Sequence, residues 1–489
     1  KGCRVLLACP KMHAGGMLAS GLGMLDTRYG PGMHGDFVRE FVAAVSAVYR
    51  KREEAGAAKW QLPQSSARPY YEPSVIESVF DVFLSSSDAH VGRIVFWRGH
   101  HLLSAETAGS RVVRITLESP GKARRVVTAR TFIDCTYEGD LAAAAGVPSR
   151  VGRESAEEWG ESLAGIRYID WRTGHERMTS DSGASSPAIQ AYCARCVFTT
   201  DREKMVPVRR PASYEQHLMD LMPLGRDFAA GRLRNRSYGK ALPNLKWELN
   251  GSINQPTSLN CPGINWAWPG ANRAHRARLE RFHVEHAASF VWFLQHDSNV
   301  PDNVRAYWRK AGLHSEEFAD NGHWPWQIYV REARRIEGRA LVTQHNFVVD
   351  KKLGRTPPVK HPVAVGEYSF DVHPCQDRRF EVDGLQEGAI WYPRNTPTKA
   401  MPGQIPYEAM LPRALDNLLV PVALSATHIG MSVVRMEPVW MTTGQIAGLA
   451  AAEAKDSGRD VANIDPALLP PRAGLIGDPW AAGLVVGHG

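Results

Sequence analysis

Histidine is the residue type best suited to moving a proton near neutral pH, because its unperturbed side-chain pKa is about 6.5. His428 lies between an apolar segment that ends at Ala423 and a small-residue segment that begins at Pro438. We therefore take His428 as the first candidate proton acceptor and His345 as the second. Arg331 could hold a substrate carboxylate or hydroxyl through its planar guanidinium fork. All three side chains have an alternative interpretation as hydrogen-bonded structural residues.

Two further spacings bring potentially reactive side chains together. Cys193 and Cys196 form a C-x-x-C pair, but the segment reads as a strand, on which residues three apart point to opposite faces. With no helix N-terminus beside them to lower a thiol pKa, redox activity is not favoured. His283 and His286 have the spacing of two ligands on one helix face. No third ligand is evident nearby, so we expect a solvated helix face and no metal site.

Glycines crowd the segment that follows a short apolar strand at residues 5–8. In a doubly wound sheet this loop lies at the carboxyl ends of the strands, where ligands bind; alone, it reads equally well as a surface loop. A literal G-x-G-x-x-G at residues 30–35 precedes a helix, but no strand leads into it and Pro31 removes a donor. The better candidates for ligand contact are therefore Gly15, Gly16, Met17, Ser20 and Gly21.

A strand predicted at residues 417–423 leads, through a loop, to a helix predicted at residues 438–454. Small residues at positions 444, 447, 448 and 451 form a smooth face on this helix, which could lie against a sheet or a flat ring. The partial positive charge of a helix N-terminus suits a group that becomes negative on reduction, such as a flavin. Close helix–sheet packing is the alternative.

The remaining elements are predicted from hydrophobic periodicity and turn residues. Residues 150–190 are polar and read as a loop or lid, and half of the tryptophans lie within residues 247–326. Those tryptophans could stack on sugar-like rings or could belong to the core. Helices are predicted at residues 37–50, 74–85, 141–145 and 273–296, and strands at residues 92–98, 111–118 and 125–134.

The composition excludes several classes of protein. The chain has 489 residues, a net charge of +7 and 44% hydrophobic residues. It contains no apolar run of about 18 residues, so we expect no membrane partner. Seven cysteines argue against a disulfide scaffold and favour a reducing compartment such as the cytoplasm. The arginines of the helix at residues 273–296 are interrupted by glutamates and accompany no nucleic-acid motif, so no nucleic-acid partner is expected.

These blocks together resemble the FAD-dependent oxidoreductase family, whose flavin domain is of the glutathione-reductase type and which includes the flavin subunit of heterodisulfide reductase. The resemblance runs in order over most of residues 4–455. It is carried by residues 13–17 (HAGGM), 20–23 (SGLG), 132–141 (FIDCTYEGDL), 160–165 (GESLAG), 320–335 (DNGHWPWQIYVREARR), 343–345 (TQH) and 404–448.

The resemblance implies an α/β fold in which a discontinuous Rossmann-like FAD-binding domain carries an inserted α+β substrate-cap domain. The expected boundaries are residues 1–165 and 405–460 for the FAD domain, 166–404 for the cap and 461–489 for a tail. It further implies that the glycine-rich loop follows the FAD pyrophosphate and flavin edge and that Thr136 lies where a strand end passes the dinucleotide. The residues implied to border the isoalloxazine and ribityl chain are Arg435, Glu437, Pro438, Gly444, Gln445 and Gly448.

The family opens with a strand, a G-x-G-x-x-G turn and a helix, about 30 residues that this sequence lacks. It also places a ribose-binding acid where this sequence has Cys9. The sequence is therefore expected to be N-terminally truncated. We expect FAD-dependent hydride transfer with a small organic substrate, polyol or sugar-like from the tryptophans, and an unidentified electron acceptor. A flavin-free binding protein or an inactive fragment is the alternative.

Overall fold

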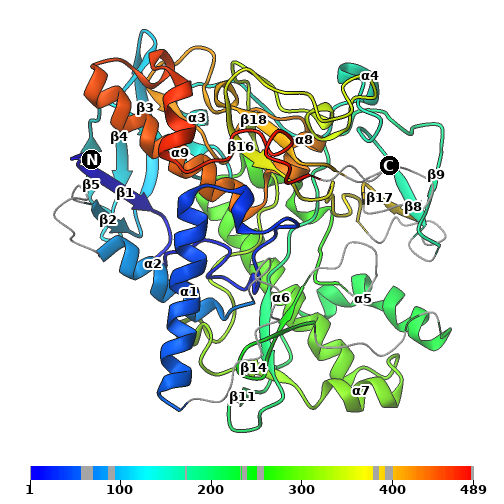
Figure 1. The fold of residues 1–489 in the computed structure, drawn as a ribbon. Coiled ribbons are helices and arrows are strands. Elements are labelled where there is room, and N and C mark those ends of the chain that lie inside the picture. The colour runs from blue at the N-terminus through cyan, green and yellow to red at the C-terminus, as the bar shows by residue number, and fades with distance from the viewer. Residues whose placement is uncertain are drawn as a thin grey trace.

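The computed structural model describes most of the chain (Figure 1). No helix in the described part is long and apolar enough to cross a membrane. The described residues are 2–56, 70–85, 94–170, 173–231, 233, 239–250, 258–377, 385–390 and 400–485.

Two pairs of parallel strands form the α/β part of the fold. β1 (Val5–Cys9) pairs with β2 (Ile94–Arg98), and β6 (Phe132–Ile133) pairs with β19 (Leu418–Leu419). Residues 92 and 93 of the predicted strand at 92–98 lie outside the described residues. The prediction of a strand over residues 417–423 is wrong beyond β19. There the backbone N–H of Val420 bonds to Met410, outside the ladder, and Pro421 has no N–H to donate.

An antiparallel meander of three strands lies beside these pairs (Figure 1). β3 (His101–Ala108), β4 (Arg111–Glu118) and β5 (Arg124–Val127) are neighbours in that order. β4 has its predicted bounds, whereas β3 was not predicted. The segment predicted as one strand over residues 125–134 is two strands, because β5 joins the meander and β6 joins the parallel pair with β19.

Helices pack around these strands close to where periodicity predicted them. α1 (Asp36–Glu54), α2 (Pro73–Ser85), α3 (Asp140–Ala144) and α9 (Glu437–Ser457) confirm the predicted helices. Pro438 lies in the first turn of α9, where its missing N–H leaves no bond unmade. α8 (His428–Val434) was predicted as loop. Thr427 caps it, since its hydroxyl accepts a bond from the Gly430 N–H at 3.0 Å.

A second, antiparallel sheet falls within the range predicted for the cap (Figure 1). Its strands, in spatial order, are β11 (Met205–Val206), β14 (Gly312–His314), β10 (Cys196–Thr199), β13 (Lys246–Leu249) and β12 (Lys240–Leu242). The helices of this region are α5 (Tyr214–Ala229), α6 (Arg273–His296) and α7 (Asp302–Trp308), and α6 has its predicted bounds.

Short antiparallel pairings join these parts. The described residues of the polar stretch at 150–190, predicted as loop or lid, begin at the end of one strand and contain a short helix and two further strands. These pairings are β7 (Ser149–Arg150) with β15 (Arg335–Ile336), β16 (Pro362–Gly366) with β18 (Gly403–Pro406), and β8 (Tyr168–Asp170) with β9 (His175–Arg177) and β17 (Leu385–Glu387). The remaining α-helices are α4 (Ala156–Trp159) and α10 (Leu469–Arg472).

The predicted tail beyond residue 460 packs onto the rest of the molecule. The carbonyl of Ala473 accepts a bond from the N–H of Asp36 at 2.8 Å, and Arg472 pairs with Glu453 of α9 at 2.6 Å. Val461, Ile464 and Leu469 share a hydrophobic core with α8, α9 and β18. Among the described residues, the 3₁₀ helices are Pro31–Met33, Ile264–Gly270, Ala319–Asn321, Gln344–Phe347, Tyr407–Met410, Val461–Asn463 and Pro466–Leu468.

Candidate functional site

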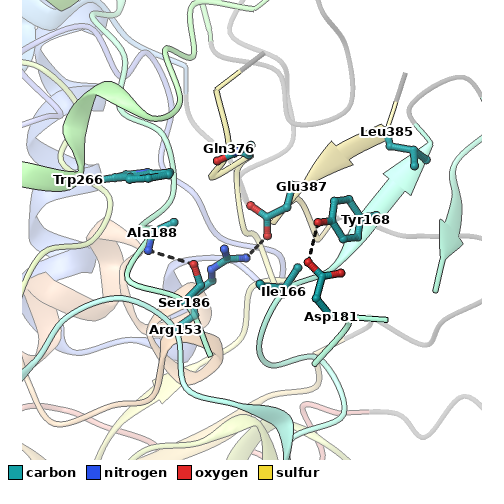
Figure 2. Close-up of a pocket in the computed structure, with 10 residues that line it drawn as sticks. All are labelled: Arg153, Ile166, Tyr168, Asp181, Ser186, Ala188, Trp266, Gln376, Leu385 and Glu387. Carbon is teal, nitrogen blue, oxygen red and sulfur yellow. Dashed lines mark hydrogen bonds and ion pairs between the residues drawn. The ribbon is translucent and has the colours of Figure 1, made fainter. Parts of the chain in front are cut away.

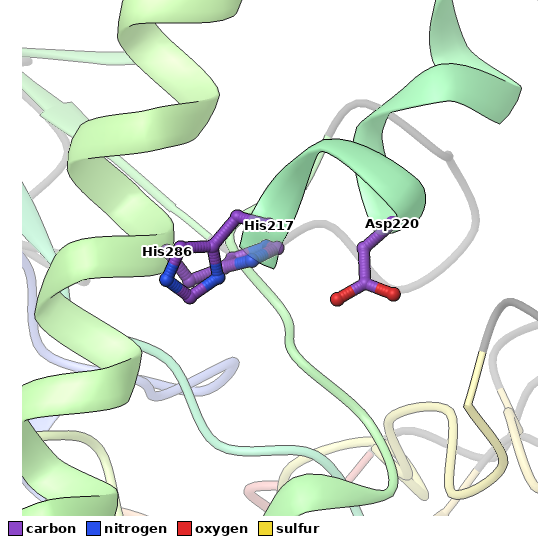
Figure 3. A group of neighbouring side chains, drawn as sticks. All are labelled: His217, Asp220 and His286. Carbon is purple, nitrogen blue, oxygen red and sulfur yellow. The ribbon is translucent and has the colours of Figure 1, made fainter. Parts of the chain in front are cut away.

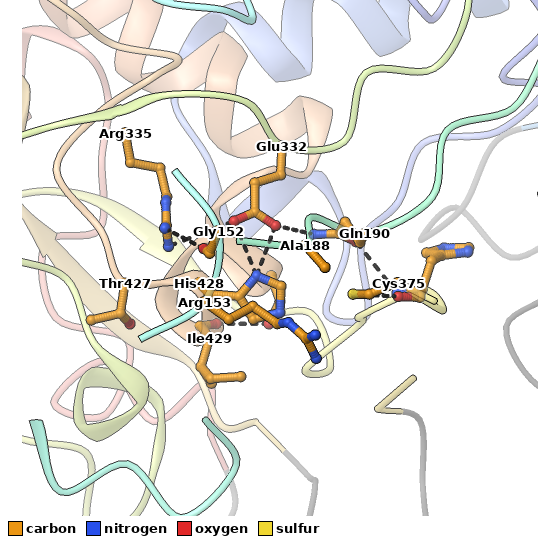
Figure 4. Close-up of polar contacts among 12 residues, drawn as sticks. Gly152, Arg153, Ala188, Gln190, Glu332, Arg335, Cys375, Thr427, His428 and Ile429 are labelled. Atoms are coloured by element: carbon orange, nitrogen blue, oxygen red, sulfur yellow. Dashed lines mark hydrogen bonds and ion pairs between the residues drawn. The ribbon is translucent and has the colours of Figure 1, made fainter. Parts of the chain in front are cut away.

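A buried histidine–carboxylate pair joins the segment before β15 to the start of α8 (Figure 4). Nδ1 of His428 lies 2.8 and 3.0 Å from the two carboxylate oxygens of Glu332. Gln190 also donates to this carboxylate at 3.1 Å. Nε2 of His428 has no hydrogen-bond partner among the described residues. The carboxylate therefore holds the proton on Nδ1 and leaves Nε2 as the free acceptor.

A second carboxylate and an arginine fix the backbone of this pair. The N–H of His428 donates to Glu154 at 2.8 Å, and the guanidinium of Arg335 lies 3.2 Å from Glu154 and 3.6 Å from Glu332. Burial raises the pKa of Glu332, but His428 and Arg335 outweigh it and leave that pKa below its ordinary value. Glu332 is therefore ionised, as a carboxylate that orients an imidazole must be.

The structure also contains a cavity of about 290 Å³, whose wall includes neither His428 nor Glu332 (Figure 2). Arg153, the residue before Glu154, lies in its wall and forms a buried ion pair with Glu387. Trp266 forms another part of the wall, and its indole N–H donates to the Cys375 carbonyl at 3.0 Å. The cavity therefore combines a flat aromatic face with a charged pair, one residue along the chain from the carboxylate that binds His428.

Three arginines surround the ring of Tyr329, two residues before Arg331. The guanidinium carbons of Arg195, Arg331 and Arg435 lie 4.7, 4.8 and 5.8 Å from the ring centroid. The Tyr329 hydroxyl donates to Glu437 at 3.2 Å and accepts from Arg435 at 3.2 Å. Because Arg331 and Glu332 are consecutive, this arginine cluster and the histidine–carboxylate pair are built on one segment.

Acidic side chains oppose this positive charge. Glu248 pairs with Arg195 at 2.6 Å, and Asp371 pairs with Arg435 at 3.0 Å. Burial, followed by the nearby negative charge of Asp26, raises the pKa of Glu437 to about 8. A carboxyl group in this position is protonated at neutral pH and can donate a hydrogen bond.

The glycine-rich loop lies against the strand end that was predicted to pass the dinucleotide. The backbone N–H of Met17 bonds to the Tyr137 hydroxyl at 3.1 Å, and a Cβ on Gly16 would lie 2.7 Å from that hydroxyl. The rings of Tyr137 and Trp440 are 5.3 Å apart, so the start of α9 meets the same point. The structure thus brings together the glycine-rich loop, the segment after β6 and the N-terminus of α9.

Other residues implied by the resemblance bond to groups of the protein itself. The Thr136 hydroxyl bonds to Asp134 at 2.7 Å and accepts from the Asp140 N–H at 2.9 Å, which closes a turn. Gln445 accepts from the N–H of Phe37 at 3.3 Å, at the start of α1. The remaining residues of the implied set lie in the loop (Gly15, Ser20, Gly21) or along α9 (Pro438, Gly444, Gly448).

Two of the predicted catalytic residues do not join His428. His345 is exposed and bonds to the Trp159 carbonyl at 3.0 Å. The fork of Arg331 is engaged by the Ala191 carbonyl and, at 3.3 Å, by the sulfur of Cys193. The two terminal nitrogens of the Arg331 guanidinium are therefore bonded to other groups of the protein. Burial lowers the pKa of Arg331.

The C-x-x-C cysteines are buried, and neither forms a disulfide with any residue that the structure describes. Burial raises the pKa of Cys196, so its thiol stays protonated and is a poor nucleophile. The prediction that the histidines at positions 283 and 286 lie on a solvated helix face is wrong, because α5 and Tyr192 cover that face. His283 and His286 are 1% and 2% exposed.

Sequence reasoning missed Glu332, Gln190 and Arg153 as site residues. Glu332 belongs to the segment at residues 320–335 that carried the family resemblance, and its position beside Arg331 was a usable signal. Gln190 and Arg153 lie in the polar stretch at 150–190, where no pattern distinguishes a buried side chain from a solvated one.

A protein-family model described as FAD dependent oxidoreductase matches residues 1–472. The chain belongs to the FAD-dependent oxidoreductase family. This FAD-dependent oxidoreductase is therefore an enzyme whose cofactor is FAD, on an α/β flavin-binding fold. No curated protein matches the chain.

Among solved structures, the chain is similar to CabE, an aromatic hydroxylase from angucycline biosynthesis. The two share 14% sequence identity, the match covers 63% of this chain and 71% of CabE, and the TM-score is 0.20. A TM-score of this size carries no information about the substrate of this oxidoreductase.

The residues around the arginine cluster could bind a flavin, because several of their buried polar atoms lack a hydrogen-bond partner in the described part of the chain. Buried atoms without hydrogen-bond partners among the described residues include Nε of Arg331, Nε of Arg435, Oε2 of Glu437 and Nε1 of Trp440. Buried polar groups are normally hydrogen-bonded, so these atoms call for a partner. An isoalloxazine ring offers carbonyl oxygens and ring nitrogens that can accept bonds from such N–H groups.

Proposed function

We propose that this FAD-dependent oxidoreductase converts a hydroxyl group of a small organic substrate to a carbonyl, with His428 accepting the hydroxyl proton. The observation that carries the proposal is the His428–Glu332 pair, in which Nδ1 is held by the carboxylate and Nε2 is free. A neutral imidazole in this tautomer is an efficient proton acceptor near neutral pH. The FAD, when bound, supplies the hydride acceptor for the carbon-bound hydrogen.

The residues around Tyr329 would hold the flavin in this proposal. Arg331 and Arg435 present N–H groups to the ring, and the protonated Glu437 can donate a further bond. In this proposal the guanidinium groups of Arg331 and Arg435 would stabilise the negative charge that a flavin gains on reduction. The glycine-rich loop and Tyr137 would lie along the adjoining part of the cofactor, as the family resemblance implies.

In this proposal the substrate occupies the cavity that Arg153 lines and reaches His428 from there. Trp266 offers a flat apolar face, and the charged pair of Arg153 and Glu387 offers donors and acceptors for hydroxyl groups. Tyr168 and Asp181 add a hydroxyl and a carboxylate, joined at 3.0 Å. A substrate with several hydroxyl groups on one flat face, polyol or sugar-like, matches this wall.

The test is anaerobic bleaching of the flavin in the purified holoenzyme by a panel of polyols, sugars, hydroxy acids and simple alcohols. We expect one polyhydroxylated class to bleach the flavin, and His428→Gln to slow that bleaching by about 10²–10⁴-fold with FAD content unchanged. The matched control is His345→Gln, which removes an exposed imidazole and should bleach at the parent rate.

Bleaching of His428→Gln at the parent rate would contradict the role of His428. Reduction only by substrates without a hydroxyl group would contradict the proposed reaction.

A further inference from the structure

Two helices of the antiparallel region bring potential metal ligands together (Figure 3). His217 and Asp220 lie three residues apart on one face of α5, and His286 lies on α6. Figure 3 shows the two imidazoles directed toward one another and the carboxylate directed into the same space. The ring centroids of His217 and His286 are 5.4 Å apart.

The spacing of these side chains suits an ion. One ligand atom from each residue lies within 4.8 Å of the other two. Bonds of about 2.0–2.2 Å to a central ion would bring such atoms to within about 4.4 Å of each other. Small side-chain rotations are enough to close that difference.

The environment of His217 is an independent indication of a ligand. Its side chain is 0% exposed, and neither of its ring nitrogens has a hydrogen-bond partner in the part of the chain that the structure describes. A neutral imidazole carries one N–H donor and one acceptor nitrogen, and burying both unpaired is costly. Phe282 packs against the ring at 4.5 Å and offers neither nitrogen a partner. A metal ion would coordinate the acceptor nitrogen.

The protonation state of His217 agrees with this role. Burial lowers its pKa, so the ring is neutral at physiological pH, the form in which imidazole binds metals. Glu285, whose negative charge acts against this lowering of the pKa, is engaged by the hydroxyl of Ser213 at 2.7 Å. Asp220 is half-buried and gives the site a route to solvent.

We propose that His217, Asp220 and His286 bind one divalent transition-metal ion that ties α5 to α6. Two imidazoles and one carboxylate are a ligand set typical of Zn²⁺ and Fe²⁺. Three protein ligands leave a position for water, which Asp220 can connect to solvent. The sequence had suggested that no further ligand lies near His286, and this proposed site differs from that expectation. The missing signal was the packing of α5 on α6, which no spacing within α6 could reveal.

The test uses the FAD-bound enzyme, stripped with a chelator and titrated calorimetrically with Zn²⁺. We expect one ion per chain, and a rise in the thermal midpoint of at least about 3 °C at saturating Zn²⁺, because the ion binds only the folded arrangement. His217→Asn should weaken Zn²⁺ binding by at least about 100-fold, and Asp220→Asn by at least about 10-fold. Asp220→Asn keeps the side-chain shape at a half-buried position, so the test survives if His217→Asn does not fold.

The matched control is His283→Gln. His283 is as buried as His286 and lies on the same helix, but its Nδ1 bonds to the Leu279 carbonyl at 2.8 Å. This variant should bind Zn²⁺ like the parent. The proposal is overturned by the absence of stoichiometric Zn²⁺ binding in the parent. It is also overturned by parent-like affinity in both His217→Asn and Asp220→Asn, which would place bound zinc elsewhere, such as on cysteine thiols.

Discussion

Nδ1 of His428 lies 2.8 Å from a carboxylate oxygen of Glu332, and the two residues are 1% and 3% exposed. The partner residues belong to segments 96 positions apart, so tertiary packing alone assembles the pair. Arg335 lies 3.6 Å from the same carboxylate. Arg335 also pairs with Glu154, which accepts a hydrogen bond from the backbone N–H of His428. The pair is therefore a rigid unit in which a change at Glu332 acts through His428.

Glu332→Gln should lower kcat by about 10- to 100-fold and leave KM nearly unchanged. The amide keeps the shape of the side chain but loses the negative charge that orients Nδ1–H, and Glu332 is not among the residues that line the cavity. Steady-state kinetics of the FAD-loaded variant measure this split. An unchanged kcat would show that the orientation of His428 by Glu332 does not contribute to turnover.

The ion pair of Arg153 with Glu387 should respond differently to single and double substitution. Both side chains are more than nine-tenths buried, so Glu387→Gln leaves a buried arginine without its counter-charge and should destabilise the protein by about 3 kcal/mol. Arg153→Met combined with Glu387→Met removes both charges and should destabilise it less than the sum of the two single changes. Thermal unfolding of Glu387→Gln, of the two single methionine variants and of the double variant checks this order; additive effects of the methionine changes would contradict it.

Much of the fold was predictable where the signals are local. α6 begins after Asn272, whose side chain caps the helix by accepting from the His275 N–H at 3.0 Å, and its predicted bounds agree with the structure. α8 was not predicted, because seven residues are too few to show a helical period. Apolar periodicity also could not show where β19 ends, since Val420 remains buried after it leaves the ladder.

The candidate site was predictable only in part, and for the same reason. His428 was identified because it lies beside a recognisable strand–loop–helix block, but its partner Glu332 has no local pattern that marks it as buried. His286 was placed on a solvated face, because the helix that covers it lies some 70 positions earlier in the chain. Spacing within one element identifies ligand types, whereas burial and partners depend on which elements pack together.

The stability of the protein should fall as pH rises from about 5 to about 8, and Glu437→Gln should reduce that fall. Burial and Asp26 raise the pKa of Glu437 to about 8, from an ordinary value of 4.5. The folded protein thus keeps this proton while the unfolded chain releases it. Stability from this group is fully present below pH 4.5 and is lost progressively up to pH 8, by at most about 1.4 kcal/mol per pH unit.

Thermal midpoints of the parent and of Glu437→Gln across this pH range measure the effect. The exposed Glu40→Gln, on α1, is the control and should follow the parent. Parallel curves for the parent and Glu437→Gln would show that Glu437 does not retain its proton in the folded enzyme.

Gly444 and Gly448 offer a direct test of whether the flavin lies against α9. A Cβ added at either position would meet no atom within 4 Å, so alanine fits without a clash. Alanine at an exposed helix position should stabilise the protein by about 1 kcal/mol relative to glycine, when no cofactor is bound. If the FAD ring or ribityl chain covers this face, the added methyl groups should weaken FAD binding by at least about tenfold.

The measurements are thermal unfolding of the FAD-stripped variants and FAD titration followed by flavin fluorescence. Higher stability together with weaker FAD binding would place the cofactor on this face of α9, as the family resemblance implies. Gly458→Ala is the matched control, because this glycine ends the same helix with φ of +73° and also meets no atom within 4 Å. That variant should lose stability through backbone strain and bind FAD like the parent. Parent-like FAD affinity in Gly444→Ala and Gly448→Ala would remove both residues from the cofactor site.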